Sequence, residues 1–229
     1  MIDVVALGEL LIDFATISVD GEGYPTMAAH PGGAPANFLA ALAKFGAKTA
    51  LLGKIGTDAF GKLLTGTLNA AGIETRGIIA TDDVFTTLAF VTFDETGNRE
   101  FSFSRKPGAD TCLSYDELNM ELIDGAKVFH FGTLSLTDEP ARTTPYKAVE
   151  YAKSAGKLIT YDPNLRKPLW KDLEEAKKQL IWGMTKADVV KISDEEVEFL
   201  WGLGVEEGAD YILKNFGVKL VFVTCGADG

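Results

Sequence analysis

Polar and charged side chains stand where several apolar segments of the chain end. Asp13 comes shortly after the apolar run Val4–Leu7, and Asn164 and Arg166 follow the run Leu158–Tyr161. Ligands of open α/β sheets bind at the carboxyl ends of the strands, so these residues are candidates for a binding site. A carboxylate there accepts hydrogen bonds from neighbouring hydroxyls, and an arginine suits hydroxyls, carboxylates or phosphates. Each also has a plainer interpretation, because loop aspartates cap turns and most arginines are solvated.

A pair of glycines, Gly32 and Gly33, precedes an alanine-rich segment whose apolar spacing predicts a helix over 36–45. Glycines at such a place let a ligand approach the backbone closely. Asn37, in the first predicted turn, offers its amide to a hydroxyl. The alternative is a tight connection into a helix with no ligand. The pair is not part of a Gly-x-Gly-x-x-Gly run, which excludes the dinucleotide-binding fingerprint.

Two further segments fit both a structural and a functional interpretation. Ser193 followed by Glu196 has the pattern of a helix capping box, which accounts for both residues. Functionally, Glu196 could instead hold, through water, a Mg²⁺ on nucleotide phosphates. Thr224, Gly226 and Gly229 read either as a strand-to-turn exit or as backbone donors beside a nucleotide. No Gly-x-x-x-x-Gly-Lys-Ser/Thr motif is present, so the chain is not a P-loop enzyme.

The elements that must position these residues alternate between strand and helix. Short apolar runs and segments of helical period follow one another, which predicts an α/β fold with a mainly parallel sheet and helices on both faces. Strands are expected at 4–7, 49–52, 128–131, 158–161, 189–192 and 220–223. Helices are expected at 36–45, 60–68, after Pro140, at 173–182, from Ser193 and at 206–216.

The middle of the chain has a different pattern. Residues 85–93 are β-branched and aromatic, residues 94–98 have turn chemistry, and Phe101–Ser104 alternates between apolar and polar side chains. This pattern predicts a hairpin with one exposed face. We expect a small β lid formed by about 84–105 together with about 14–30, with Arg105 at the end of its last strand.

Composition narrows the range of partners. The chain has 229 residues and a net charge of −11, which argues against a duplex nucleic-acid partner because such affinity rests on basic patches. Its two cysteines are far apart and form no metal-ligand pattern. The apolar N-terminal stretch carries acidic residues and is too short to span a bilayer. We therefore expect a cytoplasmic protein without a membrane partner.

Taken in order, these motifs resemble the ribokinase-like (PfkB) sugar kinases. The stretch Gly32–Gly61 is similar to the first signature of that family over its whole length, and it is the most specific match. The loop 162–166 and the end Thr224-x-Gly226-x-x-Gly229 fall in the order and spacing of the family. Within the family the chain most resembles fructokinases, through residues 105–110, 161–170 and 191–196. The resemblance covers essentially the whole chain and implies a ribokinase-like fold.

The resemblance also implies roles for particular residues. The sugar-binding residues would be Asp13, Gly32, Gly33, Asn37, Arg105 and Arg166, with Arg166 also supporting catalysis. The residues beside ATP would be Asn164, Lys191, Glu196, Thr224, Gly226 and Gly229. Glu196 would organise Mg²⁺ through water, and some relatives also use a monovalent cation. Ser193 stands where the family motif has asparagine, so the chain departs from the family pattern beside the metal.

A second family signature, a Gly-Ala-Gly-Asp run that supplies the anion hole and the catalytic base, has no counterpart among these residues. The resemblance therefore implies that the single domain 1–229 is C-terminally incomplete and that this chain alone has weak or no kinase activity. General base catalysis contributes about 10²–10⁴ in rate, and one oxyanion donor roughly 10²–10³.

The implied function is an ATP-dependent kinase that phosphorylates a primary hydroxyl of a monosaccharide, with fructose as the expected sugar. A kinase for ribose, 2-keto-3-deoxygluconate or a nucleoside is one alternative. A non-catalytic sugar-binding protein is another, because the Asp13, Gly33 and Asn37 pocket could act without transfer. The hydrophobic face of the hairpin, as in several relatives, implies a homodimer formed through the β lid.

Overall fold

The computed structural model describes residues 1–93 and 99–229 and contains two sheets. The larger sheet has seven strands, and every pair of neighbours in it is parallel. Its order is β11-β10-β9-β8-β1-β4-β5, so β1 lies inside the sheet and β11 at one edge. The strands are β1 Val4–Leu7, β4 Thr49–Gly56, β5 Ile78–Thr81, β8 Val128–Gly132, β9 Leu158–Asp162, β10 Val189–Ser193 and β11 Leu220–Thr224.

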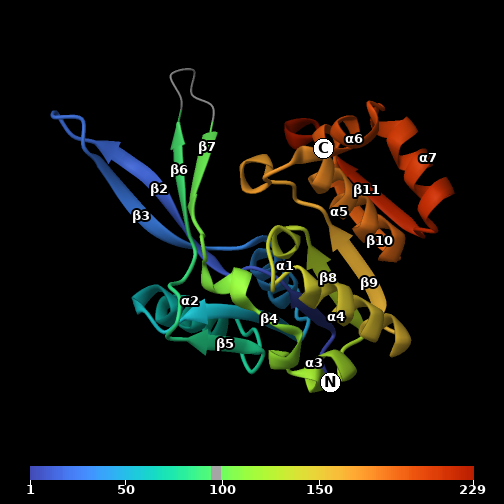
Figure 1. The fold of residues 1–229 in the computed structure, drawn as a ribbon, viewed down its shortest axis with the longest axis horizontal. Coiled ribbons are helices and arrows are strands. Elements are labelled where there is room, and N and C mark those ends of the chain that lie inside the picture. Colours follow the sequence, from blue (N-terminus) through green and yellow to red (C-terminus); the bar gives the residue numbers. More distant parts are fainter. Residues whose placement is uncertain (94–98) are drawn as a thin grey trace.

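Helices cover both faces of this sheet (Figure 1). They are α1 Ala34–Lys44, α2 Ala59–Ala70, α3 Met120–Asp124, α4 Thr143–Ser154, α5 Leu173–Lys186, α6 Asp194–Trp201 and α7 Val205–Phe216. On one face, Val4 and Ala6 pack with buried residues of α1 and α2. On the other face, Val5 and Leu7 pack in the larger core with α3, α4 and α5. The alternation along β1 therefore divides the core in two, as a strand buried on both faces requires.

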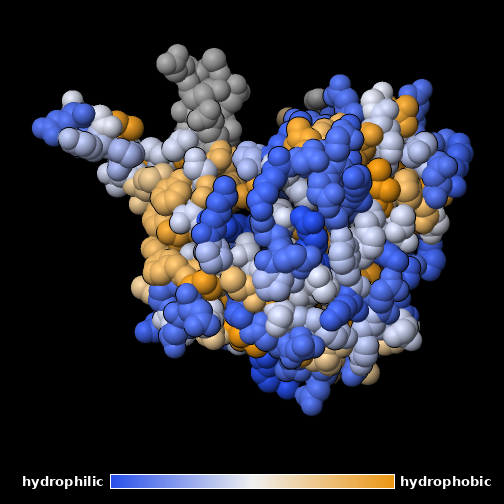
Figure 2. Space-filling model, viewed as in Figure 1, coloured by the Kyte–Doolittle hydropathy of each residue, from blue (hydrophilic) through white to orange (hydrophobic). Residues whose placement is uncertain are grey.

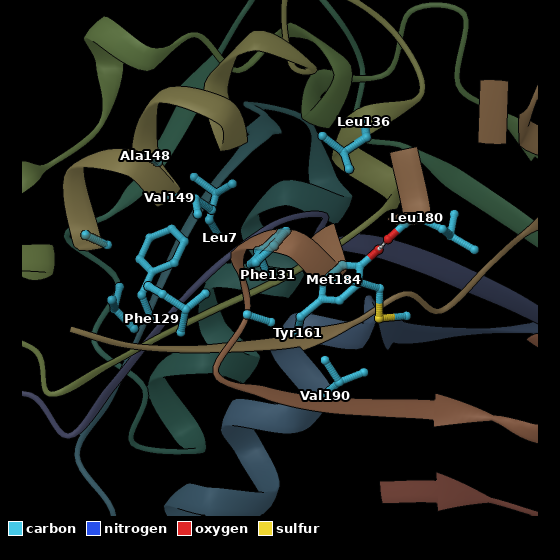
Figure 3. Close-up of a cluster of buried hydrophobic side chains, with 14 of the residues drawn as sticks. Leu7, Phe129, Phe131, Leu136, Ala148, Val149, Tyr161, Leu180, Met184 and Val190 are labelled. Carbon is cyan, nitrogen blue, oxygen red and sulfur yellow. Dashed lines mark hydrogen bonds between the residues drawn. The ribbon is translucent and has the colours of Figure 1, made fainter. Parts of the chain in front are cut away.

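Aromatic packing joins α5 to the sheet in the larger core (Figure 3). The rings of Phe131 and Tyr161, on neighbouring strands, stack with their centroids 4.7 Å apart. The Tyr161 hydroxyl donates a hydrogen bond to the carbonyl oxygen of Leu180, at 3.3 Å. A Cβ at Gly183 would lie 2.3 Å from the Tyr161 ring, so glycine allows α5 to approach β9 closely. This packing fixes the end of β9, from which the site loop leaves.

The second sheet is the predicted lid and has the order β3-β2-β6-β7. Its strands are β2 Leu11–Val19, β3 Pro25–Gly32, β6 Leu88–Phe93 and β7 Arg99–Ser104. The pairs β2–β3 and β6–β7 are antiparallel, while β2 and β6 run parallel between them. In Figure 1 these strands project from the parallel sheet beside α2. The predicted hairpin and its partner segment are thus confirmed, and the predicted turn 94–98 lies outside the described residues.

The boundaries of several elements differ from those expected. The β-rich run 85–93 becomes a strand only from Leu88, because Thr86 is held outside the sheet. The backbone N–H of Thr86 donates to Asp58 Oδ2 at 2.8 Å, and its hydroxyl accepts from the N–H of Gly56 at 3.1 Å. Strand β4 continues four residues beyond the expected end at Leu52. The edge strand β5 was not expected, since four residues are too few to show a period.

Among the residues that the structure describes, none of the helices combines the length and the apolar character needed to cross a membrane.

Candidate active site

Two adjoining cavities lie where the lid meets the carboxyl ends of the sheet strands. The smaller has a volume of about 340 Å³ and the larger about 1030 Å³. Both are lined by Phe101, Asn164 and Arg166, so the two spaces meet at these side chains. In Figure 1 the loop after β9 faces the lid strand β7, and Figure 2 shows hydrophilic surface around this region. A small and a large ligand could therefore lie end to end beneath the lid.

The smaller cavity brings together residues from β2, α1 and the loop after β9. Five predicted site residues line it: Asp13, Gly33, Asn37, Asn164 and Arg166. Burial raises the pKa of Asp13, and the positive charges of Arg166 and His30 act in the opposite direction. These five residues supply the cavity with a carboxylate, two amides and a guanidinium, a set of groups suited to a ligand rich in hydroxyls.

The two glycines serve different purposes. A Cβ at Gly32 would lie 2.2 Å from Oδ2 of Asp13, so Gly32 makes room for that carboxylate but does not itself line the cavity. Gly33 is the N-cap of α1 with φ of 112°, a conformation that favours glycine. A Cβ on Gly33 would also lie 2.4 Å from the carbonyl oxygen of Glu9. Gly33 is therefore required by the turn itself and Gly32 by the Asp13 carboxylate, and Asn37 follows in the first turn of α1 as predicted.

Glu9 is a member of the smaller cavity that the sequence analysis missed. Its side chain is buried, with 2% of the residue exposed, and Oε1 accepts a hydrogen bond from the N–H of Ala34 at 2.9 Å. Burial raises the pKa of Glu9 to about 7. The sequence did contain a signal for Glu9, which comes two residues after the end of β1. Polar residues near the ends of predicted strands were the reason for choosing Asn164 and Arg166 as candidates, and the same reason applies to Glu9.

The lid contributes apolar side chains to the same cavity, which the sequence analysis also missed. Phe101 and Phe103 of β7 line it, and their rings stack with centroids 6.3 Å apart. The guanidinium carbon of Arg166 lies 5.7 Å from the centroid of the Phe101 ring, within the range of a cation–π interaction. Phe101 thus links the lid to a charged residue of the sheet body.

The loop after β9 holds Asn164 in an unusual conformation. Its φ is 47°, the only positive value for a non-glycine residue in the described part of the chain. Asparagine tolerates this region better than most residues, and such conformations cluster at functional sites. On either side of it, Pro163 accepts a hydrogen bond from the N–H of Thr133 at 3.3 Å, and Leu165 donates to Glu196 Oε1 at 2.6 Å. These contacts present Asn164 to both cavities.

Charged residues surround the larger cavity. Lys191 of β10 lines it, and its Nζ lies 3.3 Å from Asp162 Oδ2 at the end of β9. Burial raises the pKa of Asp162, and the charge of Lys191 opposes that shift. With Lys167 and Arg166 also on its wall, the larger cavity offers three cationic side chains to an anionic ligand.

The predicted capping box at the start of α6 is confirmed. The Ser193 hydroxyl accepts from the N–H of Glu196 at 3.2 Å, and Glu196 Oε2 accepts from the N–H of Ser193 at 2.9 Å. Both carboxylate oxygens of Glu196 therefore already hold backbone groups, one of them in the site loop. Each oxygen keeps a second lone pair for a water molecule. The residue fits a metal contact through water better than a direct one.

Within the described ranges no group of three or more His, Cys, Asp or Glu residues is placed to hold a metal ion. A divalent cation at this site would therefore take most of its ligands from phosphate oxygens and water, as Mg²⁺ commonly does on nucleotides.

Arg105 is placed differently from the other predicted sugar-binding residues. It is buried and does not line the smaller cavity. Its guanidinium lies 2.7 Å from Asp110 Oδ2 and donates to the hydroxyl of Thr137 and the carbonyl oxygen of Leu134, both at 2.8 Å. Each of the three guanidinium nitrogens thus has a partner within the protein. Its sugar contact stays a prediction, whereas the geometry gives it a structural role at the base of the lid.

The last three predicted residues lie apart from both cavities. Thr224 ends β11, where it pairs in register with Ser193, and Gly226 and Gly229 follow it with φ of 58° and 131°. None of the three lines either cavity. Thr224 is nevertheless one strand away from Ser193, which lines the larger one. Their contact with a nucleotide stays a prediction.

Comparisons with known proteins agree with this geometry. The sequence model of the family described as pfkB family carbohydrate kinase matches residues 1–229 of this chain. Probable fructokinase-4 of Arabidopsis thaliana is 46% identical over 229 residues, which cover 99% of this chain and 70% of the relative. A fructokinase of Xylella fastidiosa with bound ATP superposes with a TM-score of 0.88 at 30% identity, covering 99% of this chain and 73% of that one.

A fructokinase of Vibrio cholerae O395, in its form with fructose, ADP and calcium ion bound, superposes with a TM-score of 0.86. It is 31% identical, and the match covers 100% of this chain and 72% of that one. The match to the carbohydrate kinase family extends over every residue of this chain, and the fold carries the cavity pair just described. This chain belongs to the pfkB family of carbohydrate kinases.

Proposed function

We propose that this chain binds fructose and ATP as an ATP-dependent fructokinase, which transfers a phosphoryl group to a primary hydroxyl of the sugar. The observation that carries the proposal is the meeting of the two cavities at Asn164 and Arg166. A sugar in the smaller cavity and a nucleotide in the larger one would approach each other at these two side chains. The fructokinases that resemble this chain support the choice of sugar and nucleotide.

The smaller cavity supplies groups for sugar hydroxyls. Asp13 accepts hydrogen bonds, and Asn37 can both donate and accept. Phe101 and Phe103 offer apolar ring faces to the C–H side of the sugar. The volume of about 340 Å³ is in the range of small-ligand sites, so a monosaccharide fits without a large rearrangement.

The larger cavity supplies positive charge for the phosphates of ATP through Lys191 and Arg166. Phosphoryl transfer depends mainly on positioning and on stabilising the charge of the transferring group. Arg166 stands at the shared wall, where it can contact that group as the sugar hydroxyl attacks in line. Asn164, fixed by the conformation of its loop, can donate its amide to the same group. The proposed divalent cation is Mg²⁺, with Glu196 as its contact through water, and it would neutralise phosphate charge.

A binding experiment tests the sugar assignment without requiring turnover. Calorimetry with fructose, ribose, 2-keto-3-deoxygluconate and a nucleoside is expected to give the highest affinity for fructose. Asp13→Asn is expected to weaken fructose binding about 10- to 100-fold, because hydrogen bonds to a charged group are worth roughly 1.5–3 kcal/mol. Asp210→Asn serves as the control, since Asp210 lies on the exposed face of α7 and pairs with Lys214. Equal affinities for all four ligands, or no detectable binding of any of them, would contradict the proposal.

A kinase assay tests the reaction. ADP release in the presence of ATP and Mg²⁺ is expected to be slow, because the run that supplies the catalytic base is not among residues 1–229, but to be higher with fructose than with water as the only acceptor. ADP release that is the same with and without fructose would instead identify a nucleotide hydrolase.

We also propose a homodimer formed through the lid. Ile17 and Val19 of β2 and Tyr24 in the turn that follows are 67%, 60% and 66% exposed. Exposed apolar side chains that lie together on one part of a surface are typical of protein–protein interfaces. Figure 2 shows apolar surface beside the base of the lid. Light scattering in solution is expected to give twice the monomer mass, and Ile17→Lys is expected to return the mass to that of the monomer. A monomeric wild-type protein would rule out this assembly.

A further inference from the structure

The buried carboxylate of Glu9 has no part in the function proposed so far. It lines the smaller cavity, yet the residue is only 2% exposed. Its Oε1 accepts from the N–H of Ala34, the first residue of α1, at 2.9 Å. A charged side chain is rarely buried this far without a specific partner, so this contact needs an explanation.

Glu9 contacts the start of α1 through its main chain as well as its side chain. The Cα of Gly33 packs so closely on the carbonyl oxygen of Glu9 that a Cβ there would lie only 2.4 Å away. Gly33 and Ala34 are therefore fixed against the same residue by two different groups. The first turn of α1 then carries Asn37, whose N–H donates to the carbonyl oxygen of Gly33 at 3.0 Å. The position of Glu9 thus determines where Gly33 and Asn37 face the cavity.

Charged groups approach Glu9 from two other parts of the fold. Asp110, in the 3-10 helix Ala109–Cys112, and Arg105, after β7, act on it with opposite charge. These two residues are paired with each other at 2.7 Å, so their effects largely offset. Across the cavity lie Asp13 of β2 and the Asp162–Arg166 loop. On its own segment, the neighbours Gly8 and Leu10 carry no charge.

Burial is the main reason that the pKa of Glu9 is raised to about 7, and the hydrogen bonds from its own N–H and that of Ala34 act against the shift. The carboxyl group therefore changes its charge near neutral pH, whereas an ordinary glutamate is ionised throughout this range.

We propose that Glu9 is a positioning residue for the sugar: its carboxylate holds the turn of Gly33 and Ala34 in the binding conformation, and protonation of the carboxylate loosens that turn. The consequence for the sugar rests on the function proposed for the smaller cavity. Charge-assisted hydrogen bonds are roughly twice as strong as neutral ones, so the affinity for fructose is expected to fall about fivefold when the carboxylate is protonated.

Calorimetry with fructose near pH 6 and near pH 8 measures this coupling in three proteins. The wild type is expected to bind about three to four times more tightly near pH 8 than near pH 6, because with a pKa of about 7 roughly a tenth of the carboxyl groups are still ionised at pH 6. Glu9→Gln keeps an acceptor for Ala34 but cannot ionise, so its affinity is expected to be the same at both pH values. Asp58→Asn is the matched control. Asp58 also holds a helix start, accepting from the N–H groups of Phe60 and Gly61, but its pKa is lowered and it stays ionised.

A second measurement does not depend on the sugar. The ¹⁵N and ¹H shifts of the Ala34 amide are expected to titrate near pH 7 in the wild type and to be flat in Glu9→Gln. If the wild type binds no fructose but this amide titrates, the proposed function is wrong and the hold of Glu9 on the turn is supported. If fructose binds and the pH dependence is the same in wild type and Glu9→Gln, the proposal for Glu9 fails while the fructokinase function stands. A flat Ala34 amide in the wild type also overturns it.

Discussion

Two arginines that look alike in the sequence have opposite surroundings in the fold. Arg166 is half-buried at the wall shared by the two cavities, with its guanidinium over the Phe101 ring. Arg105 is buried, and its guanidinium is bonded to Asp110, Thr137 and Leu134. Arg166 has one hydrogen bond within the protein, from Nη1 to the carbonyl oxygen of Leu165, and so keeps more donors for a ligand. Whether an arginine binds a ligand or holds the structure therefore depends on how many of its five donors the protein already uses.

Arg105 gives a prediction about stability. Arg105→Met is expected to lower the free energy of unfolding by about 3–5 kcal/mol, because it leaves the carboxylate of Asp110 buried without its partner. Urea denaturation measures the loss. Arg76→Met is the control, since Arg76 pairs with Glu74 on the surface with 61% of its side chain exposed, and such pairs are worth about 1 kcal/mol or less. A loss for Arg105→Met as small as that of the control would show that the pair has no structural importance.

Glu9 gives a second prediction, for stability as a function of pH. Its pKa is raised from 4.5 to about 7 in the folded protein, so the folded state binds this proton more tightly than the unfolded chain. The corresponding stabilisation is complete below about pH 4.5 and is lost as the pH rises through 7. Across that window the wild type is expected to lose roughly 3 kcal/mol relative to Glu9→Gln. Parallel stability curves for the two proteins between pH 5 and 8 would contradict the assigned shift.

At the scale of elements, the sequence predicted what local patterns determine. Strand β1, helix α1 and the capping box of Ser193 and Glu196 are confirmed because each depends on a few adjacent residues. The late start of β6 was not predictable, since it follows from Thr86 bonding to Asp58 and Gly56 about 30 residues away. Hydrogen bonds over such separations exist only in the folded chain.

The residues of the candidate site also fall into those that local sequence patterns predict and those whose place depends on the folded chain. Asn37 stands at a helix start and Asn164 follows a strand end, both as the sequence predicts. Asp13 was expected in a loop after β1 but lies within the lid strand β2, whose pairing with β3 and β6 the local pattern does not show. The fold brings all three into one cavity. Phe101 could not be predicted as a wall of both cavities, because its place depends on how the lid sits over the loop after β9. The sequence analysis also did not predict the pairing of Arg105 with Asp110, although the two residues are only five positions apart.

The start of α1 gives a prediction at this scale. Gly33→Ala combines the strain of a positive φ with a methyl group that overlaps the carbonyl oxygen of Glu9. Gly46→Ala has a similarly positive φ of 88° but open space around the Cβ, so it isolates the strain, about 1–3 kcal/mol. Gly33→Ala is expected to cost more stability than this control and to weaken fructose binding by at least about tenfold. Chemical denaturation and calorimetry measure both, and equal effects of the two variants would contradict the argument.

At the scale of the whole molecule, the candidate site is formed jointly by the parallel-sheet body and the lid. The sheet fixes polar groups at the ends of its strands, and β7 of the lid places an aromatic ring over them. The net charge of −11 makes local cations such as Arg166 and Lys191 the means by which an anionic nucleotide is held. A site formed by two bodies can exclude water only while they remain in contact.

Phe101 is the residue through which this contact can be tested. It lines both cavities, and its ring is the partner of Arg166, so Phe101→Ala removes a wall and the lid's hold on the guanidinium together. We expect a higher KM for fructose and a larger share of ADP released without sugar, because water then reaches the transferring phosphoryl group. ADP release with and without fructose measures this share. Phe45→Ala, at the exposed end of α1 with 89% of the residue accessible, is the matched loss of a phenyl ring and should change neither quantity. If Phe101→Ala raises the KM but leaves the sugar-independent release unchanged, Phe101 contacts the sugar and does not seal the site.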